Sequence, residues 1–296
     1  MRTSKQIILL SALILVLGML ASASGILVLD DGDPFEFTTV RGESVRVFGS
    51  GLYRYDSIVI ASGNRGVDMV TLTVAVPLLL VSIVLYRRGS TKGQVLLTGM
   101  VAYFLYVYAT LCLGTAYNDL FLVYVALFSA SFYCLLLLLN SHELLHLATR
   151  LAQRVPGRGI AMFLFVTAFV ATLAWAVSPV EAIVTGQPPD ILGDNTTLVT
   201  HALDLAITVP ALFVSGALIL RKRSTGYLIA IPLLALVAML APAVTLMTVF
   251  QIRAGVELTP AEFAGYVIGH REPGVFCAVA HVCACAEGKT CMCDED

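Results

Sequence analysis

The segment His142-Glu143-Leu144-Leu145-His146 matches the H-E-x-x-H pattern of zinc proteases. On a helix the two histidines would lie one turn apart on one face, and the glutamate could act as general base on a zinc-bound water. A catalytic zinc needs a third protein ligand, and the other loops expected on the same side of the membrane contain no Asp, Glu, His or Cys. An amphipathic interfacial segment, with its leucines in lipid, is therefore favoured over a membrane-embedded zinc hydrolase.

The end of the chain offers a second set of possible metal ligands. Four cysteines form two C-x-C pairs, Cys283 with Cys285 and Cys291 with Cys293. Thiolates bind soft metals such as Zn²⁺ or Cu(I), although the usual zinc spacing is C-x₂-C. An extracytoplasmic location would also allow disulfides. Metal binding, disulfide formation and the absence of any function all stay open for this tail, and the last is favoured.

Polar residues also stand at the starts of apolar runs, on the side opposite to the H-E-x-x-H segment. Short polar residues there commonly cap helices, and acids complement the helix dipole. Capping accounts for Asp68, Asn118 and Asp119 without any function. Asp204 lies about one turn inside its run, with His201 three residues earlier on the same face. Acids at membrane depth usually face cavities or partners, so Asp204 is the main functional candidate.

Two tyrosines of another run, Tyr103 and Tyr106, are three residues apart and would share a helix face. Their hydroxyls could donate hydrogen bonds to a buried ligand, or simply bond to a neighbouring helix. With the preceding group they predict an outward-facing polar pocket for a small solute. The candidate ligand-binding residues are Asp204, His201, Asp119, Asn118, Tyr106 and Tyr103.

Seven apolar runs would position these residues, each close to the roughly 20 residues that cross a bilayer core. They are Ile7–Leu29, Val70–Tyr86, Val95–Leu113, Leu120–Leu139, Ile160–Val177, Ala202–Leu220 and Tyr227–Phe250. Of the 296 residues 58% are hydrophobic and only 13% are charged, too few to cover these runs with polar surface. The sequence predicts an all-α membrane protein, a bundle of about seven transmembrane helices in a lipid bilayer, without an evident internal repeat.

The loops alternate in charge, which predicts the orientation. Lys and Arg occur at the N-terminus and after the second, fourth and sixth runs. The loops Gly114–Asp119 and Ser178–His201 contain neither. We therefore expect a multi-pass plasma-membrane protein with a cytoplasmic N-terminus and an extracytoplasmic C-terminus. The sequon Asn195-Thr196-Thr197 would then lie outside.

Four regions follow from this pattern. Residues 1–29 form the first transmembrane helix, or a signal peptide, because Ala21-Ser22-Ala23 resembles a cleavage site. Residues 30–68 form an extracytoplasmic loop, in which Phe35–Val40 and Ser44–Phe48 predict a β-hairpin and Gly63 and Gly66 indicate turns. Residues 69–256 form a six-helix bundle, and residues 257–296 form a Cys-rich extracytoplasmic tail.

Several functions are excluded by the residue inventory. The apolar runs contain no Lys for a retinal Schiff base and no histidines for axial haem ligation. The chain has no phosphate-binding Gly-rich loop with Lys, and its few scattered basic residues form no nucleic-acid-binding face. No cofactor is expected. A small-solute binding or transport protein is the favoured hypothesis, ahead of a structural component of a membrane complex and of the zinc hydrolase.

The stretches from Tyr117 to Ser129 and from Leu203 to Pro210, together with Arg221-Lys222-Arg223 and Gly226-Tyr227, resemble a set of uncharacterised bacterial and archaeal multi-span membrane proteins. The resemblance covers the chain from about Gly49 to Gly255. It implies a helical membrane fold in a prokaryotic cell membrane and no known activity. Such proteins end in a further apolar segment, from which the charged and Cys-rich end of this chain departs.

Overall fold

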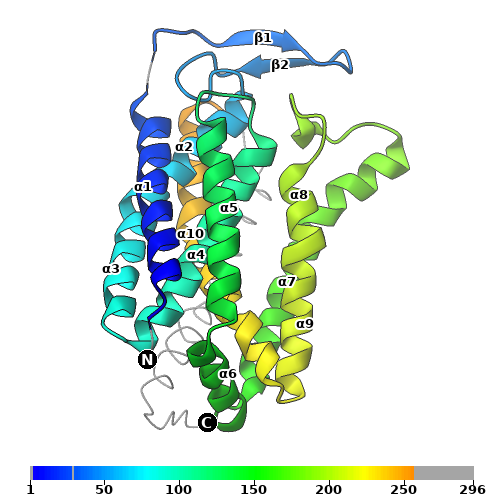
Figure 1. Cartoon of the computed structure of the whole chain (residues 1–296). Coiled ribbons are helices and arrows are strands. Elements are labelled where there is room, and N and C mark those ends of the chain that lie inside the picture. Colours follow the sequence, from blue (N-terminus) through cyan, green and yellow to red (C-terminus); the bar gives the residue numbers. More distant parts are fainter. Residues whose placement is uncertain (1–2, 29, 257–296) are drawn as a thin grey trace.

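The computed structural model describes residues 3–28 and 30–256, which form a helical bundle with one small sheet (Figure 1). In chain order the elements are α1 (Lys5–Leu27), β1 (Phe35–Thr38), β2 (Ser44–Val47), α2 (Ile58–Val70), the π turn η1 (Thr71–Ala75), α3 (Val76–Arg87), α4 (Thr91–Gly114), α5 (Phe121–Leu139), α6 (His142–Arg154), α7 (Gly157–Thr185), the 3₁₀ turn η2 (Asp190–Leu192), α8 (Val199–Leu203), the π turn η3 (Asp204–Thr208), α9 (Val209–Leu220) and α10 (Ser224–Arg253).

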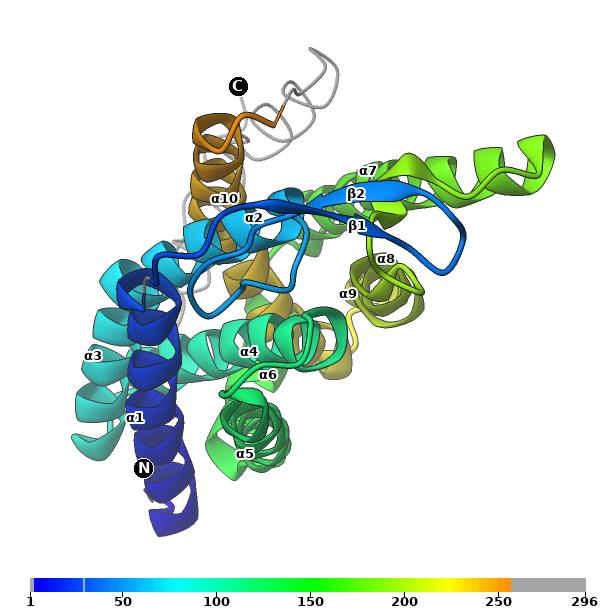
Figure 2. The same ribbon diagram turned by 90° about the horizontal axis from the view of Figure 1, so that it is seen from above.

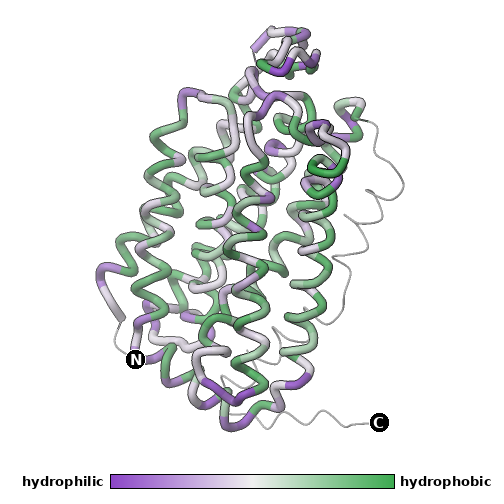
Figure 3. Tube along the Cα trace, turned by 90° about the vertical axis from the view of Figure 1, so that its right-hand side faces the viewer, coloured by the Kyte–Doolittle hydropathy of each residue, from purple (hydrophilic) through white to green (hydrophobic). Residues whose placement is uncertain are grey.

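Seven helical segments of the described chain are long and apolar enough to cross a membrane, which confirms the seven predicted runs. Two of them are compound: Ile58–Arg87 joins α2, η1 and α3, and Val199–Leu220 joins α8, η3 and α9. Hydrophobic residues fill the middle of the bundle and hydrophilic ones gather at its two ends (Figure 3).

The second segment begins at Ile58, well before the predicted Val70. The prediction that Gly63 and Gly66 mark turns is therefore wrong, because both lie inside α2. A Cβ on Gly66 would lie 2.6 Å from backbone atoms of Leu246 and Met247 in α10. The glycines thus let two helices pack with their backbones close together, a use of small residues that is common among membrane helices.

The predicted β-hairpin is confirmed, with Phe35 opposite Val47 and Thr38 opposite Ser44 in an antiparallel pair. A two-stranded hairpin is marginal alone, and this one is held by a contact to a distant loop. The Arg41 guanidinium donates hydrogen bonds to the carbonyls of Gly193 at 2.7 Å and Asn195 at 3.0 Å. The hairpin therefore spans the end of the bundle opposite to α6 (Figure 1).

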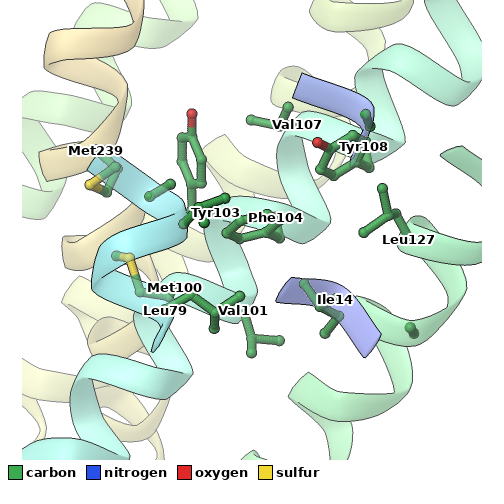
Figure 4. Packing of buried hydrophobic residues seen from close by; sticks show 14 of the residues in the cluster. Ile14, Leu79, Met100, Val101, Tyr103, Phe104, Val107, Tyr108, Leu127 and Met239 are labelled. Atoms are coloured by element: carbon green, nitrogen blue, oxygen red, sulfur yellow. The ribbon is translucent and has the colours of Figure 1, made fainter. Parts of the chain in front are cut away.

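Helix α4 is the most buried of the seven segments and forms the centre of the bundle. Its side chains Tyr103, Phe104 and Tyr108 pack with Ile14 of α1 and Leu127 of α5 (Figure 4). Helix α1 is part of this core, since Ser4 N–H donates to the Tyr86 hydroxyl at 3.1 Å and Ile14 is fully buried.

Helix α6 lies at the end of the bundle where the N-terminus is found (Figure 1). Leu144, Leu147 and Leu151 are buried in a second core cluster with residues of α7, α9 and α10. The expectation that Leu144, Leu145 and Leu147 face lipid is therefore wrong for Leu144 and Leu147, whereas Leu145 is exposed. The ends of α7, α9 and α10 at this level form the apolar surface on which α6 packs. The amphipathic pattern of one segment does not reveal whether such a protein surface or lipid covers its apolar face.

Two parts of the chain repeat the same elements at a constant spacing, contrary to the expectation of no internal repeat. In each part a π turn leads into a helix, then through a tight turn into the next helix. The second copy of each element begins 133 residues after the first: Thr71 and Asp204, Val76 and Val209, Thr91 and Ser224.

Local geometry agrees between the two copies. Pro77 and Pro210 occupy the second position of α3 and α9. The following turns are closed by equivalent backbone hydrogen bonds and place Gly89 (φ 77°) and Lys222 (φ 53°) in the left-handed region. The sequence carries a trace of the repeat that the prediction missed, since Val-Pro-x-Leu-x-Val-Ser begins at both Val76 and Val209.

The first helices of the two units also correspond. Helix α1 packs on α2, η1 and α3, and α7 packs on η3 and α9. Seen from above, α1 and α3 lie on one side of the centre and α7 and α9 on the opposite side (Figure 2). Helices α4 and α10 pack against each other between them. The bundle is thus two similarly oriented three-helix units, with α5 and α6 in the connection.

Candidate functional site

Asp204 is the first residue of the π turn η3 and is 5% exposed. Its Oδ2 accepts a hydrogen bond from the hydroxyl of Tyr106 in α4 at 2.9 Å. Two predicted site residues are thereby brought together across two helices. Widened π turns are frequent at functional sites because they alter which side chains point to one face.

His201 lies one turn before Asp204 and packs edge-on against Trp175 of α7, with ring centroids 4.6 Å apart. It lines an open groove of about 400 Å³ on the hairpin side of the bundle. The other lining residues are mostly apolar, with two hydroxyls: Pro179, Pro189, Leu192, Thr196, Thr197, Leu198, Ala202 and Leu205. Apolar walls with a few polar groups are typical of small-molecule sites.

The remaining predicted pocket residues lie elsewhere. Asn118 lies in the turn before α5, its Oδ1 accepting from Leu120 N–H at 3.0 Å. Asp119 has an 85% exposed side chain and pairs with Arg54 at 3.8 Å. Tyr103 turns away from Tyr106, its hydroxyl bonded to that of Thr71 at 2.9 Å. The predicted pocket therefore reduces to Asp204, Tyr106 and His201, since helical spacing alone does not tell which neighbour each side chain meets.

A second buried acid was missed as a site. Asp68 was predicted to cap a helix, but it lies ten residues after the start of α2 and is 1% exposed, so that prediction is wrong. Its Oδ2 accepts a hydrogen bond from Tyr53 at 2.7 Å. Gly25 of α1 faces this carboxylate so closely that a Cβ there would overlap Asp68 Oδ2. The signal was the apolar Ile58-Val59-Ile60 before Asp68, which extends the helix backwards.

Tyrosines surround Asp68. Tyr53, Tyr103, Tyr108 and Tyr124 are each at most 1% exposed and interact electrostatically with this carboxyl group or with its partners. Burial and the neighbouring Asp68 hold the pKa of Tyr53 well above its usual 10, so this hydroxyl stays a donor. Unlike the tyrosines predicted from spacing, this group is drawn from a loop and two helices.

A third buried acid, Asp56, lies in the outer loop between β2 and α2. Its Oδ1 accepts from Ala116 N–H at 2.7 Å, and its Oδ2 is buried without a hydrogen-bond partner. Burial raises the pKa of Asp56 to about 7; the nearby Asp194 also raises it and the Ala116 N–H lowers it. Asp194 in turn accepts from Ser57 N–H at 3.2 Å, which joins the loops of the two units.

The H-E-x-x-H segment forms the first turns of α6, and both His142 and His146 are exposed. Among the described residues no three His, Cys, Asp or Glu side chains are grouped closely enough to hold a metal ion. The cysteines Cys283, Cys285, Cys291 and Cys293 lie outside the described residues. The geometry therefore offers the two histidines of α6 no third ligand from the described part of the chain.

The geometry thus points to the groove at His201, to the neighbouring pair Asp204 and Tyr106, and to the buried acid Asp68 in the other unit. Comparisons with protein-family models, curated proteins and solved structures found no match to this chain.

Proposed function

We propose that this chain is a multi-pass plasma-membrane protein that binds and transports a small solute through the groove at His201. The hairpin, this groove and Asn195 lie outside, and α6 and the N-terminus lie in the cytosol. The positive-inside distribution supports this orientation, because the loops after the second, fourth and sixth segments, on the α6 side, all contain Lys or Arg. Among the described loops on the hairpin side, only the one that contains the hairpin has arginines.

The observation that carries the proposal is the pairing of Asp204 with Tyr106, because Asp204 lies in the chain between His201 and Leu205, which both line the groove. A carboxylate at this depth is costly unless it serves a ligand or a partner. Its π turn disrupts regular helix hydrogen bonding at the same place, which is how transporter helices often form substrate sites.

The groove also indicates a class of solute. Its walls are largely apolar, and its polar groups are His201 and two threonine hydroxyls, with Asp204 one helical turn after His201. A carboxylate prefers a positive partner, and the aromatic ring of Trp175 beside His201 suits a cation as well. We therefore propose a small organic cation with an apolar body.

Binding can be tested with alkylammonium ions of increasing chain length, and with alkylcarboxylates of the same lengths as controls. Thermal stabilisation of the protein in lipid nanodiscs should be seen with the ammonium series only. Asp204→Asn should weaken it at least ~10-fold, equivalent to about 1.4 kcal/mol. Asp119→Asn, at an exposed acid, should leave it unchanged. Equal stabilisation by both series, or an unaffected Asp204→Asn variant, would contradict the proposal.

Transport and orientation need separate measurements. Proteoliposomes should accumulate a radiolabelled alkylammonium ion with the wild type and not with Asp204→Asn. Single cysteines in a cysteine-free background should react with an impermeant reagent on intact cells at Glu36→Cys in β1, but not at Gln153→Cys in α6. Labelling at position 153 alone would mean that the orientation is the reverse of the one proposed.

A further inference from the structure

Asp68 is a buried carboxyl group that belongs to none of the ion pairs of the described residues. The ion pairs of the described residues join Arg41 with Glu43 and Arg54 with Asp30 and Asp119, and none includes Asp68. The Arg65 guanidinium, one turn earlier on α2, lies over the ring of Phe48 at 5.7 Å, and its Nε is buried without a hydrogen-bond partner.

An ionised carboxylate in such a place costs several kcal/mol after relaxation, and a buried acid usually takes up a proton instead. The groups facing Asp68 are suited to the neutral form. They are the hydroxyls of Tyr53 from the outer loop, Tyr103 and Tyr108 from α4, and Tyr124 from α5. Arg65 is the one charged group among these neighbours.

Helices α1 and α10 face this part of α2 with uncharged residues. Helix α1 presents Gly25, and α10 presents Met247 and Gln251 to the glycines of α2. The Tyr124 hydroxyl is buried beside Tyr53 and Asn118 and interacts electrostatically with Asp68. A protonated carboxyl can donate a hydrogen bond to a neighbouring hydroxyl oxygen, which a carboxylate cannot do.

Tyr53 lies between Asp68 and the hairpin side of the bundle. A narrow crevice on that side is lined by Gly25, Phe48, Gly51, Tyr53 and Arg65 among others. Tyr53 therefore borders this crevice and also donates a hydrogen bond to Asp68. Because Tyr53 is only 1% exposed, its hydroxyl can pass a proton between the acid and water only when the crevice widens.

The internal repeat connects this acid with the groove. Asp68 and His201 occupy equivalent positions, each three residues before the first residue of a π turn, Thr71 or Asp204. Helix α4 bonds to both of these turn residues, through Tyr103 to Thr71 and through Tyr106 to Asp204. One rigid helix thus contacts both units at the same structural feature.

We propose that Asp68 is a proton-binding site that exchanges its proton with the outside through Tyr53. In the resting state the carboxyl is protonated, and loss of the proton gives a carboxylate and a proton in the outer water. This assignment needs no solute. We further infer, resting on the proposed function, that binding of a cation at Asp204 drives this release through α4.

Infrared difference spectroscopy between acidic and alkaline pH tests the assignment directly. The wild type should show the carbonyl band of a protonated carboxylic acid, which Asp68→Asn abolishes and Asp119→Asn preserves. Asp68→Glu should keep a band at a changed frequency, which guards against misfolding of the asparagine variant. Tyr53→Phe should shift the band, because a hydrogen bond to the carboxyl is removed. The proposal would be overturned if no band depends on Asp68. It would also be overturned if the band disappears at constant pH when sodium replaces choline in the buffer, because Asp68 would then bind sodium in place of a proton.

Coupling is measured as proton release into weakly buffered solution when an alkylammonium ion is added. The wild type should release protons and Asp68→Asn should not, while still binding the ion. Binding without proton release by the wild type refutes the coupling alone. An Asp68 band in a protein that binds no alkylammonium ion refutes the proposed function and leaves the proton site intact.

Discussion

At the scale of single residues, the three buried acids differ in the groups that surround them. Asp204 accepts from one tyrosine, Asp68 lies among four, and Asp56 binds a backbone N–H while its second oxygen lacks a partner. Only neutral donors contact them. Each is therefore placed where its protonation state responds to small changes in its surroundings.

Asp56 gives a prediction for pH. Its pKa rises from 3.8 to about 7 on folding, chiefly by burial. Between these values the folded protein binds more protons than the unfolded one, so raising the pH through this window lowers the free energy of unfolding, by at most ~1.4 kcal/mol per pH unit.

The measurement is hydrogen exchange of the loop from β2 to α2 in nanodiscs at pH 5 and pH 8. Protection should be higher at the lower pH. Asp56→Asn, which carries no charge at either pH, should remove most of the difference. A loop that is better protected at pH 8 would show that Asp56 is not buried as described.

At the scale of elements, the two π turns determine which side chains of α2 and α8 face α4. Deleting Val74, an exposed residue of η1, should convert the turn to regular α-helix. Each residue rotates a helix by roughly 100°, so Asp68 would turn away from Tyr53 and the Asp68 infrared band should move or vanish. Deleting the exposed Val214 within α9, outside a π turn, should leave that band unchanged.

The tight turns between helices allow a comparison within the same molecule. Gly89 has φ 77°, so Gly89→Ala should destabilise the protein by about 1–2 kcal/mol, the cost of the left-handed region for a residue with Cβ. Lys222 already bears this cost at φ 53°, so Lys222→Gly should be neutral or stabilising. Thermal unfolding in one detergent measures both, and a loss of stability in Lys222→Gly would contradict the assignment.

The sequence predicted the number of apolar segments and the hairpin, because length, hydrophobicity and turn residues act locally. It did not predict the start of α2, because Asn64, Arg65 and the two neighbouring glycines are typical of a loop. Only the packing of α10 against these glycines explains why they lie in a helix. It did not predict the Asp68 site either. Four tyrosines from a loop and two helices converge there only through packing, and the sequence gives no distance between helices.

At the scale of the whole molecule, Arg41 joins the two units at the hairpin end of the bundle. Its hydrogen bonds to Gly193 and Asn195 hold the hairpin of the first unit on the loop that borders the groove of the second. Opening the groove therefore requires these bonds to break or the hairpin to move with the loop.

Arg41→Ala should loosen this loop without unfolding the bundle, because charged hydrogen bonds of this kind contribute about 1.5–3 kcal/mol each at most. Hydrogen exchange of residues 186–198 should rise several-fold while that of α4 stays constant. Arg46→Ala on the same hairpin is the matched control, with no change expected. Unchanged exchange of the loop in Arg41→Ala would mean that other contacts hold it.

Helix α5 is the one membrane-length segment without a copy in the described chain. A unit of three crossings ends on the side opposite to its start, and this single extra crossing brings the chain back before the second unit begins. Removing it would invert the second unit, so that the groove at His201 and the crevice at Tyr53 would lie at opposite ends of the bundle. The odd number of crossings in that connection, more than its residues, keeps both sites at the same end.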